Sequence, residues 1–546
     1  MNKKIPVEKG KSYELVIHTL GTNGEGVGRI ENFTVFVPHA LPGERVRVKL
    51  NEVKKTYASA HIEELLVRSH DRIEPRCAVY GQCGGCQLQH LAYDAQLRVK
   101  RQQVIDAATR IGKLQNLFVA PTIGAVTPWN YRNKMQFPVG MEKGHVVIGC
   151  YARNTHHIIS TESCHIQAEG NNEIVRVVGE IIERLQIPVY NEDRHIGVLR
   201  HIIGRVGVDG ELMVVIVTAT RNLPREKEFV RLLRCKLPQL VSIHQNIQTY
   251  RNNVIMGRET RLLWGQPTIR DAIGQLSFHI SPRSFFQVNT AQANVLYSMA
   301  LEYAQLTGNE TVIDAYCGTG TITLFLARKA RKVYGIEIVK PAILDARRNA
   351  RDNHIKNAEF IVGDATEVMP RLYKQGIRAD VIVVDPPRAG CTPTVLQTFA
   401  NMHPRRIVYV SCNSASLARD LSILQTLGYV AEKAQPVDMF PMTSHVETVC
   451  LLVLRTPVTH INIDVDVEEM VQDKRGLATY GQIKDYVLER SGLKVSSLYI
   501  AQVKQKHGII ERENYNKPKS EDARQPQCPL EKERAITEAL KHFGML

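Results

Sequence analysis

Three residues with reactive side chains lie at the borders of apolar, β-rich runs of the sequence. They are Cys412, with a thiol, and Asp385 and Glu447, each with a carboxyl group. Asp385 and Cys412 follow such runs, whereas Glu447 comes directly before one, residues 448–454. In an open α/β sheet, the binding site lies at the carboxyl ends of the parallel strands. A last strand antiparallel to the others would therefore bring Glu447 to the edge that holds Asp385 and Cys412. The pattern predicts that a thiol, a carboxylate and a candidate base converge on one substrate.

A turn of small residues at 315–321, between a predicted strand and a predicted helix, indicates a cofactor site. Such a turn lets backbone N–H groups approach a ligand closely. The next strand pattern ends in Glu337, whose carboxylate could accept hydrogen bonds from both hydroxyls of a ribose, and a third ends in Asp364, suited to an adenine edge. Thr323 stands where a dinucleotide fingerprint has its third glycine, so S-adenosylmethionine fits better than a nicotinamide dinucleotide.

Four cysteines in two segments form a second candidate site. Cys77, Cys83 and Cys86 form a C-x5-C-x2-C pattern beside glycines, and 77 residues separate Cys86 from Cys164. Four soft ligands in such loops indicate a metal centre, and the chemistry alone leaves a four-cysteine zinc site open. A disulfide is the weakest interpretation, because the 11 cysteines are odd in number and no apolar signal segment begins the chain. We therefore expect a reducing, cytoplasmic location.

The charge balance limits the classes of partner. The 546-residue chain has 70 Lys and Arg against 55 Asp and Glu, a net charge of +15, which favours a polyanionic partner without proving one. No apolar run approaches the roughly 18 residues that would cross a bilayer, so the sequence predicts no membrane span.

These motifs together resemble the RNA uracil-5-methyltransferase family, and within it the 23S ribosomal RNA enzymes that carry an iron–sulfur cluster. The family pattern Phe-x-Gln-Val-Asn stands at residues 285–289, and Ser-Cys-Asn at 411–413 is followed by Ser414 where the family has proline. The resemblance covers nearly all of residues 9–455. It implies an α/β fold with a class I, Rossmann-like S-adenosylmethionine methyltransferase core.

The residue types suit methylation of a pyrimidine, because carbon 5 of uracil is too weak a nucleophile to attack a sulfonium methyl group unaided. A thiolate that adds to carbon 6 solves this problem, and a base must then remove the carbon 5 proton. Cys412 is the expected nucleophile and Glu447 the expected base. Since a free thiol, of pKa about 8.5, is mostly protonated at neutral pH, we expect surroundings that favour the thiolate of Cys412.

The resemblance assigns further roles. It implies that Asp385 hydrogen-bonds the uracil ring and that the four cysteines hold a 4Fe-4S cluster, more structural than redox-catalytic because methyl transfer needs no electrons. The expected cofactor-binding residues are Gln287, Tyr316, Gly318, Thr321, Glu337, Asp364 and Asp385. The expected substrate-binding residues are Phe285, Arg132 and Lys134.

Other functions remain open at this stage. The barrel and the cysteines favour 23S ribosomal RNA as the partner of a monomeric enzyme, but transfer RNA is a live alternative substrate. A non-catalytic RNA-binding iron–sulfur protein would not need Cys412, Asp385 and Glu447 together. Amino methylation of adenine needs no thiol, and cytosine-5 enzymes place a cysteine after the proline where this chain has Arg388.

Four parts are expected along the chain. In residues 1–70, apolar and polar residues alternate as in a small β-barrel. This part resembles a TRAM domain, an oligonucleotide-binding-like module. Residues 71–275 form an α+β central domain with the cysteines, and residues 276–456 form the methyltransferase domain. Residues 457–546 extend beyond the family's usual end as a helical extension of unknown role, with helices expected near 479–488 and 495–506.

Overall fold

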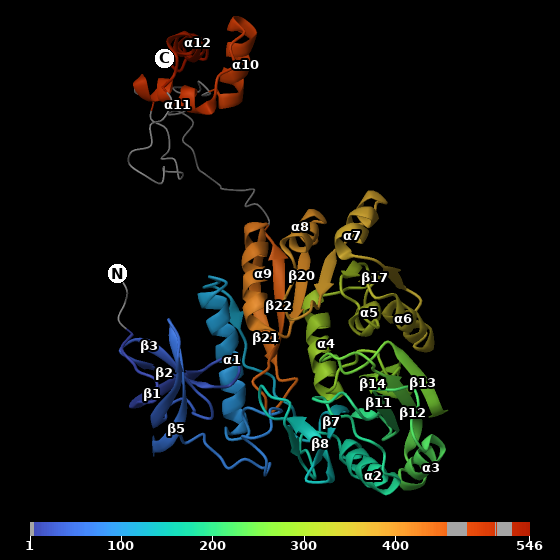
Figure 1. Ribbon diagram of the computed structural model, residues 1–546. Coiled ribbons are helices and arrows are strands. Elements are labelled where there is room, and N and C mark those ends of the chain that lie inside the picture. The colour runs from blue at the N-terminus through green and yellow to red at the C-terminus, as the bar shows by residue number, and fades with distance from the viewer. Residues whose placement is uncertain (1–4, 456–477, 508, 510–526) are drawn as a thin grey trace. The chain divides into compact units, whose positions relative to one another are not determined.

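The computed structural model describes residues 5–455, 478–507, 509 and 527–546 (Figure 1). The chain divides into two compact units, Met1–Thr456 and Pro457–Leu546, and each is described here by itself. Within the described parts of the chain, no helix combines the length and the apolar character needed to cross a membrane.

The first unit begins with a closed five-stranded barrel, which confirms the predicted β-barrel. Its strands alternate between buried and exposed residues: in β4, Val46 and Val48 are fully buried, whereas Arg45 and Lys49 are exposed. This period of two is what a sheet with one buried face requires. The strands are β1 (Ser12–Leu20), β2 (Gly26–Ile30), β3 (Phe33–Val37), β4 (Arg45–Val53) and β5 (Tyr57–Val67).

A mixed seven-stranded sheet follows, with the order β13-β12-β11-β10-β7-β8-β9. The apolar faces of helices α2 (Glu169–Leu185) and α3 (Glu226–Lys236) share one buried cluster with it. The strands are β7 (Lys134–Glu142), β8 (His145–Tyr151), β9 (Ile158–Ser160), β10 (Leu199–Val206), β11 (Leu212–Thr218), β12 (Leu240–Ile247) and β13 (Glu259–Gly265). The hairpin β14 (Ile269–Ile273) and β15 (Leu276–Ile280) leads from this sheet to the next.

An eight-stranded sheet of order β18-β17-β16-β19-β20-β22-β21-β6 carries the candidate site (Figure 1). Strands β16 to β20 run parallel, and β22 runs antiparallel to β20, which is the condition under which the sequence places Glu447 beside Asp385 and Cys412. The strands are β16 (Thr311–Asp314), β17 (Lys332–Glu337), β18 (Ala358–Val362), β19 (Val381–Val384), β20 (Arg406–Ser411), β21 (Tyr429–Val437) and β22 (Glu447–Leu454). This arrangement is the expected Rossmann-like core.

Helices cover both faces of this sheet, because its strands are apolar on both sides. In β19, Val381 and Val383 face one buried cluster, whereas Ile382 and Val384 face another. The first cluster includes α4 (Thr290–Ala304), α5 (Thr321–Ala327) and α6 (Lys340–Asp352). The second includes α7 (Ala365–Lys374), α8 (Pro393–Asn401) and α9 (Ser414–Thr426).

One helix from the N-terminal half of the chain also packs on this core. Helix α1 (Tyr93–Arg110) contacts α9, and the short strand β6 (Phe118–Val119) pairs in parallel with β21. Residues 93–119 thus pack against the eight-stranded sheet; the sequence assigns them to the central part, with the helix near 94–111 also able to pack on the methyltransferase core.

The described residues of the second unit form three helices around a small apolar core, which confirms a helical C-terminal region. They are α10 (Tyr480–Ser491), α11 (Ser497–Lys506) and α12 (Leu530–His542). A capping box at Thr479 begins α10, and Gly492, at φ 71°, ends it. Helix α12 was not predicted, although Ile536 and Leu540 have the spacing of a helix face and are fully buried.

Candidate active site

The three reactive residues meet at one edge of the eight-stranded sheet. Asp385 follows β19, Cys412 follows β20 and Glu447 begins β22. Ser411 and Thr448 are partners in the antiparallel ladder of β20 and β22. Cys412, just after β20, and Glu447, at the start of β22, therefore lie at the same edge of the sheet, as the sequence predicted.

The surroundings of these residues favour protonated forms. Burial and then the charge of Asp385 raise the pKa of Glu447 to about 8. Burial and then Asp314 raise the pKa of Asp385 to about 7. Burial raises the pKa of Cys412 to about 11, with Glu447 and Asp385 adding to the effect, while the Arg388 guanidinium opposes it. The expectation that the site by itself favours the thiolate of Cys412 is therefore wrong.

The physical reason is that burial and two carboxyl groups outweigh one guanidinium at the thiol. The raised pKa values of Asp385 and Glu447 leave much of each carboxyl group neutral near pH 7, so the free site avoids three adjacent negative charges. Perturbed groups that cluster in this way are typical of sites for proton transfer.

A cavity of about 780 Å³ lies beside this edge, within the size range of small-molecule sites. We call it the glycine-turn cavity, because residues 316–319 line it. Six of the seven predicted cofactor-binding residues line it: Gln287, Tyr316, Gly318, Thr321, Glu337 and Asp385. Residues that line it without having been predicted include Arg283, Ser284 and Asp345.

The backbone of the turn at 318–320 depends on glycine. Gly318 lies at φ 53° and Gly320 at φ 84°, a region that other residues rarely adopt. A Cβ atom on Gly320 would also lie 3.0 Å from the ring of Phe360. The carboxylate of Glu337 accepts hydrogen bonds from the N–H groups of Gly318 (3.3 Å) and Val339 (2.9 Å), which fixes it at the cavity wall.

Asp364 stands apart from the other predicted cofactor residues. It follows β18 as expected, but it does not line the glycine-turn cavity. Its carboxylate instead caps α7, where it accepts hydrogen bonds from the backbone N–H of Thr366 (2.8 Å) and its hydroxyl group (2.6 Å). These bonds lower the pKa of Asp364.

A second cavity, of about 470 Å³, is named here the cysteine cavity because Cys77, Cys83, Cys86, Cys150 and Cys164 all line it. Phe285, Phe286 and Gln287 line both this cavity and the glycine-turn cavity. The segment 285–287 therefore separates the two spaces. Phe285 is 76% exposed, which leaves its ring free to contact a ligand.

The predicted RNA-facing residues differ in their positions. Arg132 lines the cysteine cavity, and the hydroxyl group of the neighbouring Tyr131 donates a hydrogen bond to the carbonyl oxygen of Pro441 (3.0 Å). Lys134 does not line the cavity. Burial, with the positive charges of Arg205 and Arg132, lowers the pKa of Lys134 to about 7, so its amine is partly neutral near pH 7.

The four predicted metal ligands thus share one cavity, although 77 residues separate Cys86 from Cys164. Within the residues that the structure describes, no group of three or more Cys, His, Asp or Glu side chains is close enough to hold a single metal ion. The four thiols line one space without forming such a group. Cys150 in β8 is a fifth thiol that no sequence pattern indicated, since it lies alone in an apolar strand.

Other residues at the site also had no predicted role. Arg388, Phe440 and His445 line the cysteine cavity, and Arg388 also acts electrostatically on Cys412 and Glu447. Arg388 follows the Asp-Pro-Pro turn and His445 precedes Glu447 by two residues, so both were within reach of sequence reasoning. Phe440 carries no such signal, because it stands in an irregular loop.

Known proteins share both the sequence and the architecture. The family model for tRNA (uracil-5-)-methyltransferase matches residues 248–455, and the TRAM domain model matches residues 6–62. An uncharacterized RNA methyltransferase of Halalkalibacterium halodurans is 50% identical over 454 residues, which cover 83% of this chain and 99% of the relative. One from Clostridium tetani is 49% identical over 453 residues, covering 83% and 98%.

A solved structure is also similar. The Pyrococcus abyssi tRNA (uracil-54, C5)-methyltransferase, in complex with S-adenosyl-L-homocysteine, is 30% identical with a TM-score of 0.64. The match covers 81% of this chain and 99% of that one.

Proposed function

Because this chain belongs to the RNA uracil-5-methyltransferase family, we propose that it methylates carbon 5 of a uridine in 23S ribosomal RNA through a covalent adduct with Cys412. The enzyme is an S-adenosylmethionine-dependent RNA methyltransferase. The observation that supports the proposed chemistry is the meeting of Cys412, Glu447 and Asp385 beside the glycine-turn cavity. That cavity is the proposed site of S-adenosylmethionine, with Glu337 toward the ribose.

The proposed reaction has four balanced steps. The Cys412 thiolate bonds to carbon 6 of uracil, and the electrons of the carbon 5–carbon 6 double bond move toward O4 as an enolate. Carbon 5 then takes the methyl group as the sulfonium carbon–sulfur bond breaks, leaving S-adenosylhomocysteine. Glu447 removes the carbon 5 proton, the double bond returns, and the carbon 6–sulfur bond breaks to release the thiolate.

Asp385 suits a polar contact to the uracil edge. With a pKa of about 7, its carboxyl group holds a proton in part of the molecules at neutral pH. In that form it can donate a hydrogen bond to O4 and accept one from N3–H. The donor would become stronger as negative charge develops on O4, so the contact would stabilise the enolate.

A 4Fe-4S cluster is the group proposed for the cysteine cavity, held by Cys77, Cys83, Cys86 and Cys164. The donor set fits, because four thiolates are the usual ligands of such a cluster. A single zinc ion needs four sulfur atoms about 2.3 Å from one point, and the described residues have no such arrangement. Each thiolate of a cluster binds a different iron, so thiols around a space are the better match.

Transfer RNA is the alternative substrate, supported by the similarity to the Pyrococcus abyssi enzyme. Mapping by mass spectrometry of 5-methyluridine in ribosomal and transfer RNA, from cells with and without this protein, tests the choice. We expect loss of a 5-methyluridine from 23S ribosomal RNA alone. Loss from transfer RNA alone would overturn the ribosomal proposal and leave the reaction intact.

A further inference from the structure

The loop of residues 438–446 joins β21 to β22 and ends at the candidate base. Val437 and Glu447 are partners in the antiparallel ladder, so this loop closes the hairpin directly beside Glu447. Phe440 and His445 in the loop line the cysteine cavity. The conformation of the loop therefore decides how Glu447 and the cavity wall are presented to a substrate.

Helix α1 presents a row of polar side chains to this loop. Tyr93, Gln96 and Lys100 are spaced by three and four residues and so lie on one face of the helix. Gln96 and Lys100 are fully buried. Neither lines the cysteine cavity or the glycine-turn cavity, so both would act on the reaction through the residues they hold in place.

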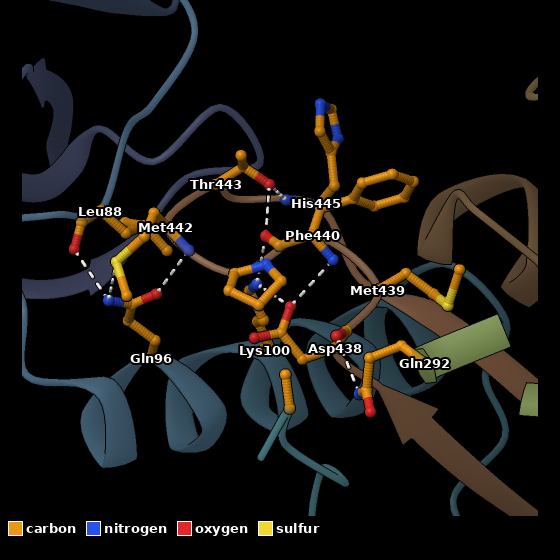
Figure 2. A network of polar contacts seen from close by, with 12 residues as sticks. Leu88, Gln96, Lys100, Gln292, Asp438, Met439, Phe440, Met442, Thr443 and His445 are labelled. Carbon is orange, nitrogen blue, oxygen red and sulfur yellow. Dashed lines mark hydrogen bonds and ion pairs between the residues drawn. The ribbon is translucent and has the colours of Figure 1, made fainter. Parts of the chain in front are cut away.

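Lys100 and Asp438 form a buried ion pair at the start of the loop (Figure 2). Their nitrogen and oxygen atoms are 2.5 Å apart, and both side chains are fully buried. The Lys100 ammonium also donates to the carbonyl oxygen of Phe440 (3.1 Å), and the Tyr93 hydroxyl donates to Asp438 (3.0 Å). Gln292 of α4 donates to the carbonyl oxygen of Asp438 (3.0 Å). The first turn of the loop is thus fixed from both sides.

Gln96 forms hydrogen bonds both to the middle of the loop and to the cysteine segment, which we define as residues 77–91. Its Oε1 accepts a hydrogen bond from the N–H of Met442 (3.1 Å), and its Nε2 donates to the carbonyl oxygens of Leu88 (3.0 Å) and Leu91 (2.8 Å). The N–H groups of Gln87 and Leu88 both donate to the carbonyl oxygen of Met442 (3.0 Å each). Figure 2 shows the amide of Gln96 between Leu88 and Met442.

Met442 shows why the loop needs this support. Its backbone lies at φ 68°, a left-handed conformation that is unfavourable for a residue with a side chain. Such a conformation persists where the surroundings determine it, and it often marks functional sites. The hydrogen bonds to Gln96, Gln87 and Leu88 supply those surroundings.

We propose that Gln96 and Lys100 are positioning residues, which hold the 438–446 loop so that Glu447 can remove the carbon 5 proton. The inference rests on the proposed function of Glu447. It further links the cysteines to catalysis, because Leu88 lies two residues after Cys86 and shares the amide of Gln96 with Met442. A change in the cysteine segment would reach the base through that amide.

The variant Gln96→Leu tests the proposal, with Gln245→Leu as its matched control. Gln245 is also fully buried and donates to the carbonyl oxygens of Thr220 and Arg221, but it lies in β12 of the other sheet. We expect kcat of Gln96→Leu to fall tenfold to about a hundredfold, as for a misplaced catalytic group, with KM changed less. Proton removal follows methyl transfer and precedes release of the thiolate. The covalent RNA adduct should therefore accumulate in Gln96→Leu and not in Gln245→Leu.

The pair Lys100→Met and Asp438→Asn gives an independent measurement. Either change alone leaves one buried charge without its counter-ion, whereas the double variant has neither the positive nor the negative charge. We expect the double variant to recover activity and thermal stability relative to Lys100→Met. Equal activity and equal adduct in the wild type and in every soluble variant of Gln96, Lys100 and Asp438 would overturn the proposal.

Glu447→Gln separates this inference from the function on which it rests. Adduct in Glu447→Gln but none in Gln96→Leu overturns the positioning role and leaves the base assignment intact. No adduct in Glu447→Gln overturns the base assignment, and the positioning role with it.

Discussion

Ser411 of β20 pairs with Thr448 of β22, and this pairing makes neighbours of Cys412 and Glu447, which are 35 positions apart in the sequence. Burial and the nearby carboxyl groups raise the pKa values of both residues. The pKa of the thiol therefore depends on the charge of the base beside it.

Replacing Cys412 by alanine should abolish methylation while binding of S-adenosylmethionine survives, because the thiol does not line the glycine-turn cavity. We expect less than about a hundredth of wild-type turnover, in line with the loss of a nucleophile. Methyl transfer to RNA and cofactor titration measure the two properties. Cys235→Ala, at an exposed cysteine of α3, serves as the control and should keep full activity. Turnover of Cys412→Ala near that of the control would refute the nucleophile assignment.

Glu447→Gln should trap a covalent protein–RNA adduct, because the amide cannot accept the carbon 5 proton after methyl transfer. The adduct should appear as a slow band on a denaturing gel when cofactor and RNA are both present. The double variant Glu447→Gln with Cys412→Ala is the control and should show no band. A band in the double variant would mean that another residue bonds to the RNA.

The methylation rate should increase from about pH 6 to about pH 8, because deprotonation of Glu447 and Cys412 outweighs loss of the Asp385 proton, which has a pKa of about 7. Glu447 must lose a proton with a pKa of about 8, and Cys412 one with a pKa of about 11. Single-turnover rates at constant ionic strength measure this dependence. A rate that is constant or falls over this range contradicts the protonation states described for the free site.

The contribution of Glu447 to the stability of the fold should decrease as the pH rises, whereas the methylation rate increases. The pKa of Glu447, about 8 in the folded protein, lies above its ordinary value of 4.5, so the folded state binds an additional proton between these values. Its stabilising contribution is complete below about pH 4.5 and is lost as the pH rises through about 8. Glu447→Gln should therefore raise the melting temperature more at pH 9 than at pH 5, whereas Glu302→Gln, at an exposed residue of α4, should not.

Protein purified anaerobically should contain about four irons per chain. Cys83→Ser should lose iron, solubility and RNA affinity, because the four thiols tie two distant segments together, while S-adenosylmethionine still binds. Cys150→Ser is the matched control: it changes a thiol of the same cavity that is outside the proposed ligand set, so iron should remain. Stoichiometric zinc without iron would overturn the cluster and leave the methylation mechanism untouched.

The sequence alone predicted the edge at which the site forms. Apolar runs identify strands, and the carboxyl ends of parallel strands share one edge, so Asp385 and Cys412 could be placed together by local pattern. The glycine turn and Glu337 followed from the same reasoning. These features depend on residues close in the sequence, and the structure places them as expected.

The tertiary structure decided the features that depend on distant residues. The pKa of Cys412 is set by the burial and charges that three strand ends create together, so no local pattern could show that the thiol is disfavoured as an anion. Asp364 has the predicted position but uses its carboxylate to cap α7. Gln96 and Met442 are 346 positions apart, and only packing of α1 against the core joins them. Local sequence determines which strands and turns form, whereas burial and long-range contacts determine what their side chains can do, because the free energy of a charge or a hydrogen bond depends on everything that surrounds it.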